Sequence, residues 1–441
     1  MTDTPLADAL RTFAAAHPLR MHMPGHKGKF LPLAELSAAA PLDFTELPPT
    51  GDLFGTGGPI RAAEDLWAAA FRAEHCLFLT GGTTQGMLAA FALACRPGEA
   101  VLIDRGCHRC VYNALALMDL HPHYLCRPWL EEEALFGPIS PQAVDKYLTC
   151  HPEIKTVCIT SPTYYGICSD VPAIAAAVHA HHALLLVDGA HGAHLPFLGD
   201  WDLSAADAAV VSAHKTLPAP GQSALLFSST FPFGEMQKAA ALFGSSSPSY
   251  LMMAALDAAR AWMEDEGQQA LSAAAEQAAF LRRRFPALTG PGLKLDPLRL
   301  AIRCSDGFDA QEKLEALGVY PEMADRRHLV FICTAADAPE DFYRLSAALA
   351  QVLRGQPSGP LPPLPPPPEP QVVLPPRAAR FAGKKSIPLA RAAGEIAGEQ
   401  AAPYPPGVPV LAPGERITKK TIAYLTQIGY NMEKDMDVVL F

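Results

Sequence analysis

Between residues 75 and 230 the hydrophobic positions form short apolar runs, each followed by a polar turn and an alanine-rich stretch with helical spacing. The runs are CLFLT (76–80), AVLID (100–104), TVCIT (156–160), ALLLVD (183–188), AAVVS (208–212) and SALLF (223–227). Most are apolar throughout, which is typical of strands that helices cover on both faces. The pattern predicts an α/β fold built on a mostly parallel sheet.

The sequence after the predicted sheet indicates additional domains. Helical spacing continues to about residue 285, and two apolar runs near 298–304 and 328–334 flank a helical stretch around 310–317, which indicates a small α/β domain. A proline-rich stretch then predicts an extended connector. The predicted division is an N-terminal arm (1–30), a large domain (31–285), a small domain (286–355), a linker (356–376) and a C-terminal domain (377–441).

Charge and apolar content limit the partners. The 441 residues carry a formal net charge of −10, which opposes binding to nucleic acid or to an anionic membrane. No apolar run approaches the roughly 18 residues of a membrane span, and the N-terminus lacks a signal-peptide pattern. We therefore expect a cytoplasmic protein with a small-molecule substrate and neither a nucleic-acid nor a membrane partner.

The ten cysteines are scattered along a long chain, so we expect most of them to be reduced and buried. Cys107 and Cys110 form a CxxC, which alone is compatible with half a zinc site or a redox pair. A second matching pair does not follow in the sequence, so we expect no metal there.

The chemistry is sought where the strands end, because open α/β sheets bind ligands at the carboxyl ends of their strands. Lys215 follows the fifth apolar run in SAHK. A lysine amine can bond to the aldehyde of pyridoxal phosphate. That cofactor also needs a sheltered carboxylate beside its ring nitrogen, and Asp188 ends the preceding run. Taken alone, a surface lysine and a helix-capping aspartate remain open alternatives.

A phosphate group needs backbone donors, hydroxyls and preferably the start of a helix. The turn GGTTQG offers Gly82, Thr83 and Thr84 at the beginning of a helical run, and Ser212 can add a second hydroxyl. A glycine-threonine turn without a ligand is the alternative.

Several histidines fall at the same strand ends. His108 follows the second run at a place suited to stacking on a cofactor ring, although a loop histidine fits the pattern too. The others are His191, His194 and His214. A metal site built from these three is an alternative, but no acidic ligand pattern accompanies them.

The motifs MHMPGHKGK, DFTEL, TGGTTQG, SPTYYGICSD, VDGAHGAH, SAHKTL and SSSPSYLMMAALD together resemble the Orn/Lys/Arg decarboxylases, in the shorter bacterial form without an N-terminal wing domain. The resemblance is dense over about residues 20–257 and returns at PYPPGVPVLAPGE (403–415).

This resemblance implies a pyridoxal-phosphate enzyme of fold type I, the aspartate-aminotransferase-like fold, that decarboxylates a basic amino acid as a homodimer. It implies that Lys215 bonds to the cofactor, Asp188 pairs with the ring nitrogen and His108 stacks on the ring. The remaining implied cofactor-binding residues are Gly82, Thr83, Thr84, His191, Ser212, His214 and Ser246, the last contributed by the neighbouring subunit. The implied catalytic residues are Lys215, His108, Asp188 and His214.

Two departures from the family pattern stand out. Gly189 occupies a position where the family usually has an acidic residue, and DRGCHRC differs from the usual Arg-Asn-x-His-x-Ser. Another fold-type-I reaction, such as transamination or a lyase reaction, and a non-catalytic ligand-binding relative therefore remain alternatives. Among substrates, arginine is favoured over lysine and ornithine, and Asp43, Glu46 and Asp52 are candidates for binding the basic side chain.

Overall fold

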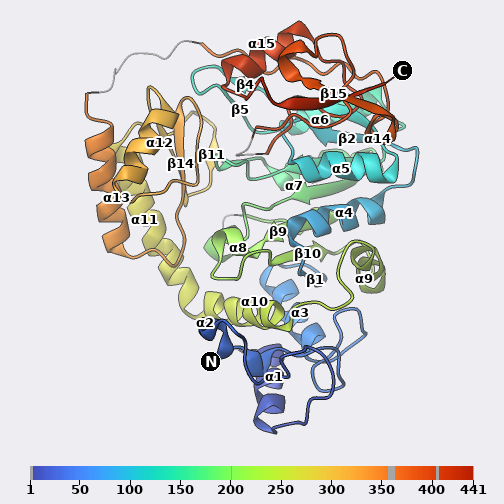
Figure 1. The fold of residues 1–441 in the computed structure, drawn as a ribbon, viewed down its shortest axis with the longest axis vertical. Helices are drawn as coiled ribbons and strands as arrows, with labels where there is room; N and C mark the ends of the chain where they lie inside the picture. Colours follow the sequence, from blue (N-terminus) through green and yellow to red (C-terminus); the bar gives the residue numbers. More distant parts are fainter. Residues whose placement is uncertain (1–2, 200, 356–362, 404–406, 441) are drawn as a thin grey trace. The chain divides into compact units, whose positions relative to one another are not determined.

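A seven-stranded sheet in the order β1-β10-β9-β8-β6-β2-β3 dominates the computed structural model, which describes residues 3–199, 201–355, 363–403 and 407–440 (Figure 1). Its strands are β1 (His75–Leu79), β2 (Ala100–Asp104), β3 (His121–Leu125), β6 (Thr156–Thr160), β8 (Leu184–Asp188), β9 (Ala208–Ser212) and β10 (Ala224–Ser228). β8 pairs parallel with β9, and β2 pairs parallel with both β6 and β3, whereas β10 is antiparallel to β9 and β1. The predicted mostly parallel sheet is confirmed.

Six of these strands coincide with the predicted apolar runs to within one residue at each end. The exception is β3, whose sequence HPHYL was not predicted as a strand. It lies at the edge of the sheet, where only Leu125 is buried, so its side chains do not form an apolar run. An edge strand has a solvent-facing side that tolerates polar residues.

The chain divides into two compact units, and the first comprises the residues up to Leu93, Leu186–Ala273 and Thr334–Ala336. Its helices are α1 (Pro5–Ala15), α2 (Ala34–Ser37), α3 (Pro59–Ala70), α4 (Gly82–Ala94), α8 (Ala213–Thr216), α9 (Phe233–Ala241) and α10 (Tyr250–Trp262). The buried Asp257 carboxylate of α10 accepts the backbone N–H groups of Leu6 and Ala7 at 2.9 and 3.1 Å. These bonds fix the otherwise unsatisfied first turn of α1 against α10.

The second unit contains the rest of the large sheet and a small three-stranded antiparallel sheet. The small sheet consists of β12 (Arg299–Arg303), β13 (Met323–Ala324) and β14 (His328–Ile332), and two short strand pairs are β4 (Trp129–Leu130) with β5 (Leu135–Phe136) and β7 (Ile167–Cys168) with β11 (Lys294–Leu295). The helices are α5 (Arg109–Met118), α6 (Pro141–Cys150), α7 (Val171–Ala180), α12 (Gly307–Ala316) and α13 (Pro339–Val352), and α11 (Gln268–Arg284) begins in the first unit and continues into this one. The predicted strands near 298–304 and 328–334 and the helix between them are confirmed.

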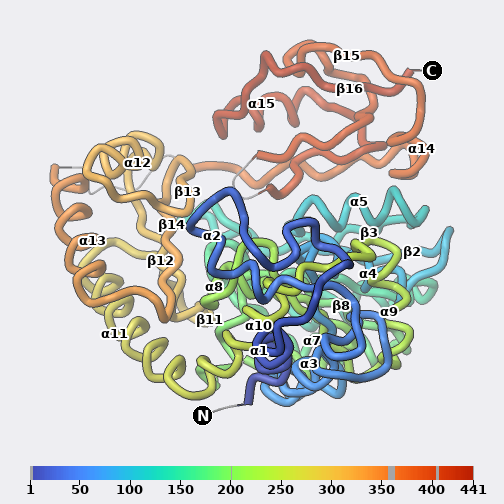
Figure 2. The backbone as a smooth tube through the Cα atoms, turned by 60° about the horizontal axis from the view of Figure 1, so that its bottom comes forward, coloured from blue at the N-terminus to red at the C-terminus, as the bar shows by residue number. Residues whose placement is uncertain are grey.

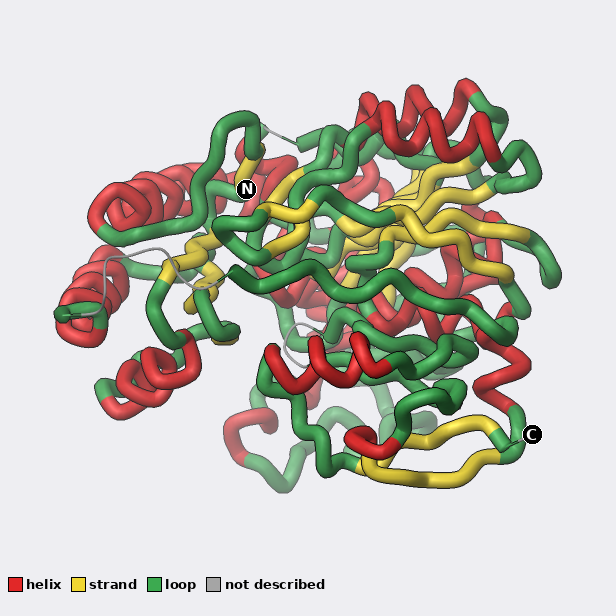
Figure 3. The backbone as a smooth tube through the Cα atoms, turned by 90° about the horizontal axis from the view of Figure 1, so that it is seen from above, coloured by secondary structure: helices red, strands yellow, loops and turns green. Residues whose placement is uncertain are grey.

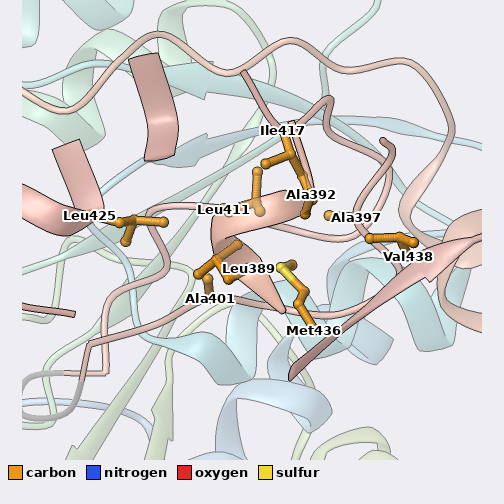
Figure 4. Packing of buried hydrophobic residues seen from close by; sticks show 9 residues of the cluster. All are labelled: Leu389, Ala392, Ala397, Ala401, Leu411, Ile417, Leu425, Met436 and Val438. Atoms are coloured by element: carbon orange, nitrogen blue, oxygen red, sulfur yellow. The ribbon is translucent and has the colours of Figure 1, made fainter. Parts of the chain in front are cut away.

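The C-terminal part of this unit has a hydrophobic core of its own (Figure 4). It contains α14 (Pro376–Phe381), α15 (Lys419–Gln427) and the antiparallel pair β15 (Lys384–Pro388) and β16 (Asp435–Val439), which Figure 3 shows in yellow beside the C-terminus. Figure 2 shows α14 next to α5, and Arg377 donates to the Leu117 carbonyl at 2.8 Å. Residues 356–362 of the predicted linker lie outside the described residues, and 363–375 contain no helix or strand. The predicted domain boundaries stay a prediction.

Candidate active site

Lys215 lies in α8, the short helix that directly follows β9 (Figure 1). Its Nζ is 3.1 Å from Nε2 of the buried His191, which belongs to the loop after β8. Because β8 and β9 are parallel neighbours, their carboxyl ends lie side by side. The fold thus brings together a half-buried amine and an imidazole that the sequence separates by two dozen residues.

Asp188 is the last residue of β8 and is only 2% exposed. One carboxylate oxygen accepts the Ala190 N–H at 3.1 Å, and among the described residues no basic side chain forms an ion pair with it. The buried Asp104 at the end of β2 is different, because Arg127 lies 2.6 Å from its carboxylate. A buried carboxylate without a counter-charge is costly, so Asp188 suits a cationic ligand group such as a protonated pyridine nitrogen.

The turn between β1 and α4 is shaped for an anion. Gly82 has φ = +70°, a conformation that favours glycine, and it begins α4. The Ser212 hydroxyl donates to that of Thr83 at 3.3 Å, and Thr84 is exposed in the same first turn. The helix start, its free backbone N–H groups and these hydroxyls fit a phosphate group.

Gly86 allows α4 to pack closely on the strand β9 that ends at Ser212. A Cβ at Gly86 would lie 2.5 Å from the Val210 side chain of β9 and 2.6 Å from that of Leu79 in β1. Only a glycine lets α4 pack this closely on the two strands.

His214 and Ser246 belong to the same unit. The His214 Nδ1 is 2.9 Å from the Ser223 carbonyl, which fixes the ring beside Lys215 in the sequence. Ser246 is exposed in the segment that precedes α10.

The absence of an acidic residue at position 189 has a packing cause. A Cβ on Gly189 would lie 2.9 Å from Cη2 of the buried Trp201 and 3.3 Å from the Val210 carbonyl oxygen. The Trp201 indole therefore occupies the space that any larger residue at 189 would need. Nothing in the sequence pattern pointed to Trp201.

His108, in the second unit, is the N-cap of α5, and its Nδ1 accepts the Cys110 N–H at 3.3 Å. Cys107 and Cys110 are buried, and the ten cysteines are reduced thiols, eight of them buried. The preceding Arg105 forms a bidentate pair with Glu415, with nitrogen-to-oxygen distances of 2.7 and 3.0 Å. Both side chains are at least nine-tenths buried.

The C-terminal motif therefore holds the loop that carries His108. Arg105 also donates to the Val410 carbonyl at 2.8 Å, and the Arg109 N–H donates to the Gly407 carbonyl at 3.2 Å. The loop DRGCHRC thus packs against the end of the motif PYPPGVPVLAPGE. Sequence reasoning singled out both motifs but missed their pairing; residues 404–406 of the second lie outside the described residues.

The fold is that of the fold-type-I pyridoxal-phosphate enzymes. The architecture is similar to that of the lysine decarboxylase of Francisella novicida (TM-score 0.83, 19% identity, covering 99% of this chain and 81% of that one). It is also similar to an L-threonine transaldolase from Pseudomonas fluorescens in its internal aldimine state (TM-score 0.56, 16% identity, 79% and 80% covered).

The chain belongs to the Orn/Lys/Arg decarboxylase family. The model of the family's major domain matches residues 4–298, and that of its C-terminal domain matches residues 369–434. The arginine decarboxylase of Bacillus subtilis is 29% identical over 96% of this chain and 93% of its own length. Within the described residues, every helix is too short or too polar to cross a lipid bilayer.

Proposed function

We propose that this protein is a pyridoxal-phosphate-dependent decarboxylase that converts a basic amino acid, with arginine favoured, to the corresponding amine and carbon dioxide. The observation that carries the proposal is the buried Asp188 without a basic partner at the end of β8, beside the strand that leads into Lys215. Family membership and the arginine decarboxylase relatives support the reaction and the substrate class.

Each residue then has a defined task. Pyridoxal phosphate, when bound, supplies an aldehyde that bonds to amines and a ring that takes up the electrons left by departing carbon dioxide. With the cofactor bound, Lys215 would hold its aldehyde group and Asp188 would keep its ring nitrogen protonated. The 3.1 Å contact lets His191 exchange a proton with the Lys215 amine. We assign the phosphate to Gly82, Thr83, Thr84 and Ser212.

We retain three further assignments from the resemblance. His108 stacks on the ring, His214 orients the lysine segment, and Ser246 serves the site of the other subunit in a homodimer. The proposal also includes a cytoplasmic location for the protein. The amine that it forms is a polyamine or a polyamine precursor.

For the basic side chain of the substrate we favour Glu46 among the three candidate carboxylates. Asp43 is paired with His26 at 3.1 Å, and Asp52 accepts the Phe54 N–H of its own turn at 2.9 Å. In contrast, Oε1 of Glu46 is buried and has no hydrogen-bond partner among the described residues. A buried carboxylate oxygen without a donor suits a guanidinium or ammonium group.

The test is to supply purified protein with pyridoxal phosphate and, separately, arginine, lysine and ornithine, and to measure carbon dioxide and amine. We expect release from arginine without a keto acid. Lys215→Ala should abolish turnover and the imine absorption band, whereas Lys238→Ala, at an exposed lysine of α9, should change neither. Full activity of Lys215→Ala, or a requirement for a keto acid, would contradict the proposal.

A further inference from the structure

A cluster of two imidazoles and a carboxylate lies at the edge strand of the large sheet. His123 belongs to β3, His151 follows the last residue of α6, and Glu153 is two residues further on. Their potential ligand atoms all lie within 4.8 Å of one another. Both histidines are half-buried and Glu153 is exposed, so the cluster is accessible to an ion from solvent.

Tyr147, one helical turn before His151, orients both rings. Its ring stacks on that of His151, with centroids 4.8 Å apart and an interplanar angle of 27°. Its hydroxyl is 3.3 Å from Nδ1 of His123. If the hydroxyl accepts the Nδ1 proton, Nε2 of His123 keeps its lone pair free for a metal. Metal-binding histidines are held in this way by a partner on the other ring nitrogen.

The third side chain is already directed to the same place, because Oε1 of Glu153 lies 3.1 Å from Nδ1 of His151. Zinc binds imidazole nitrogen and carboxylate oxygen at about 2.0–2.2 Å, which sets neighbouring ligand atoms about 3.3 Å apart. Small side-chain rotations therefore suffice to close the cluster around one ion. Two imidazoles favour zinc and related transition metals over calcium or magnesium.

We propose that His123, His151 and Glu153 form a binding site for a divalent transition metal of the zinc type, with Tyr147 as the residue that positions His123. The remaining coordination position faces solvent and takes a water molecule. The site ties the edge strand β3 to the end of α6, so the bound ion stabilises this part of the second unit. This inference does not depend on the proposed decarboxylase activity.

The experiment is zinc titration of the full-length, cofactor-loaded protein by calorimetry, in a Cys126→Ser/Cys150→Ser background. Those are the two exposed cysteines, which could otherwise bind zinc. We expect one zinc per chain. His123→Ala and Glu153→Gln should each weaken binding by at least about ten-fold, and Tyr147→Phe, which keeps the ring and removes the hydroxyl, by about ten-fold.

The matched control is His181→Ala. His181 is also a partly exposed histidine paired with a carboxylate, Asp145 at 2.8 Å, but it is not part of the three-residue cluster. Its loss should leave zinc affinity unchanged. Three results would overturn the proposal. They are the absence of stoichiometric zinc binding, a His181→Ala variant that weakens binding as much as His123→Ala does, and an unchanged zinc affinity in both His123→Ala and Glu153→Gln. A thiolate charge-transfer band with Co²⁺ as the probe would do so too, since it would assign the metal to cysteine.

Discussion

His328 at the start of β14 is a buried histidine held between two carboxylates. It is 0% exposed, its Nε2 is 3.2 Å from Glu133, and its Nδ1 is 3.3 Å from both oxygens of Asp325. Burial alone would lower the pKa of His328, but the hydrogen bonds and charges of Asp325 and Glu133 outweigh it and raise the pKa to about 9. The same contacts lower the pKa of Asp325 against the effect of its own burial. His328 is therefore protonated in the folded protein at neutral pH.

The pH dependence of the unfolding free energy follows from the direction of this pKa change. In the unfolded chain the imidazole pKa is about 6.5, so the folded protein binds the proton more tightly. One pKa unit corresponds to about 1.4 kcal/mol, so the difference between about 6.5 and about 9 is worth about 3 kcal/mol. This stabilisation is fully present below pH 6.5 and is lost as the pH rises through 9.

The perturbation is His328→Gln, which keeps a hydrogen-bond donor but cannot titrate. The assay is urea unfolding of wild type and variant at pH 6 and pH 9.5, followed by circular dichroism. We expect the stability advantage of the wild type to shrink by about 3 kcal/mol between the two pH values. A wild-type advantage that is equal at both pH values would refute the reasoning.

Three further predictions concern the candidate site. Gly189→Glu alone should destabilise the protein by about 1–3 kcal/mol in thermal unfolding, because the new side chain collides with Trp201. The double variant with Trp201→Ala should recover part of that loss, and equal stability of Gly189→Glu and wild type would contradict the steric argument. Arg105→Ala should cost about 3–5 kcal/mol in urea unfolding by leaving Glu415 buried and unpaired, whereas replacing both partners with apolar residues should cost less. Glu46→Gln should raise the KM for arginine at least about ten-fold with a smaller change in kcat, and an unchanged KM would remove Glu46 from substrate recognition.

The central strands were predictable because burial on both faces leaves a continuous apolar run in the sequence. β8, for example, is buried over Leu185–Asp188, and β9 is buried throughout. The same rule failed at β3, since an edge strand can carry His121 and His123 without an energetic penalty. Pattern reasoning therefore finds the middle of a sheet more readily than its edge.

Within the candidate site, the sequence identified residue types but not their partners. The position of Asp188 at the end of an apolar run was sufficient to single it out. Asp104 also ends an apolar run, and only the structure shows that Asp104 pairs with Arg127 whereas Asp188 accepts a backbone N–H. The pair of Arg105 and Glu415 spans 310 residues, and no local pattern encodes a contact at that separation. The zinc-type cluster was missed for the same reason, since its three side chains come from β3 and from the end of α6.

The departure from the family pattern at position 189 has a physical explanation that leaves the proposed chemistry in place. At Gly189 the change is steric: Trp201 fills the volume beside the end of β8, and Asp188 stays buried there. In the loop after β2 the changes fall at Gly106 and Cys110, whereas Arg105 keeps the arginine of the family pattern and, through its pair with Glu415, anchors the segment that carries His108. Removing one partner of a buried ion pair leaves the other charge buried and uncompensated. If the proposed stacking role of His108 is right, the C-terminal domain therefore acts on catalysis by keeping that loop in a single conformation, and loss of Glu415 should lower kcat even where the protein remains folded.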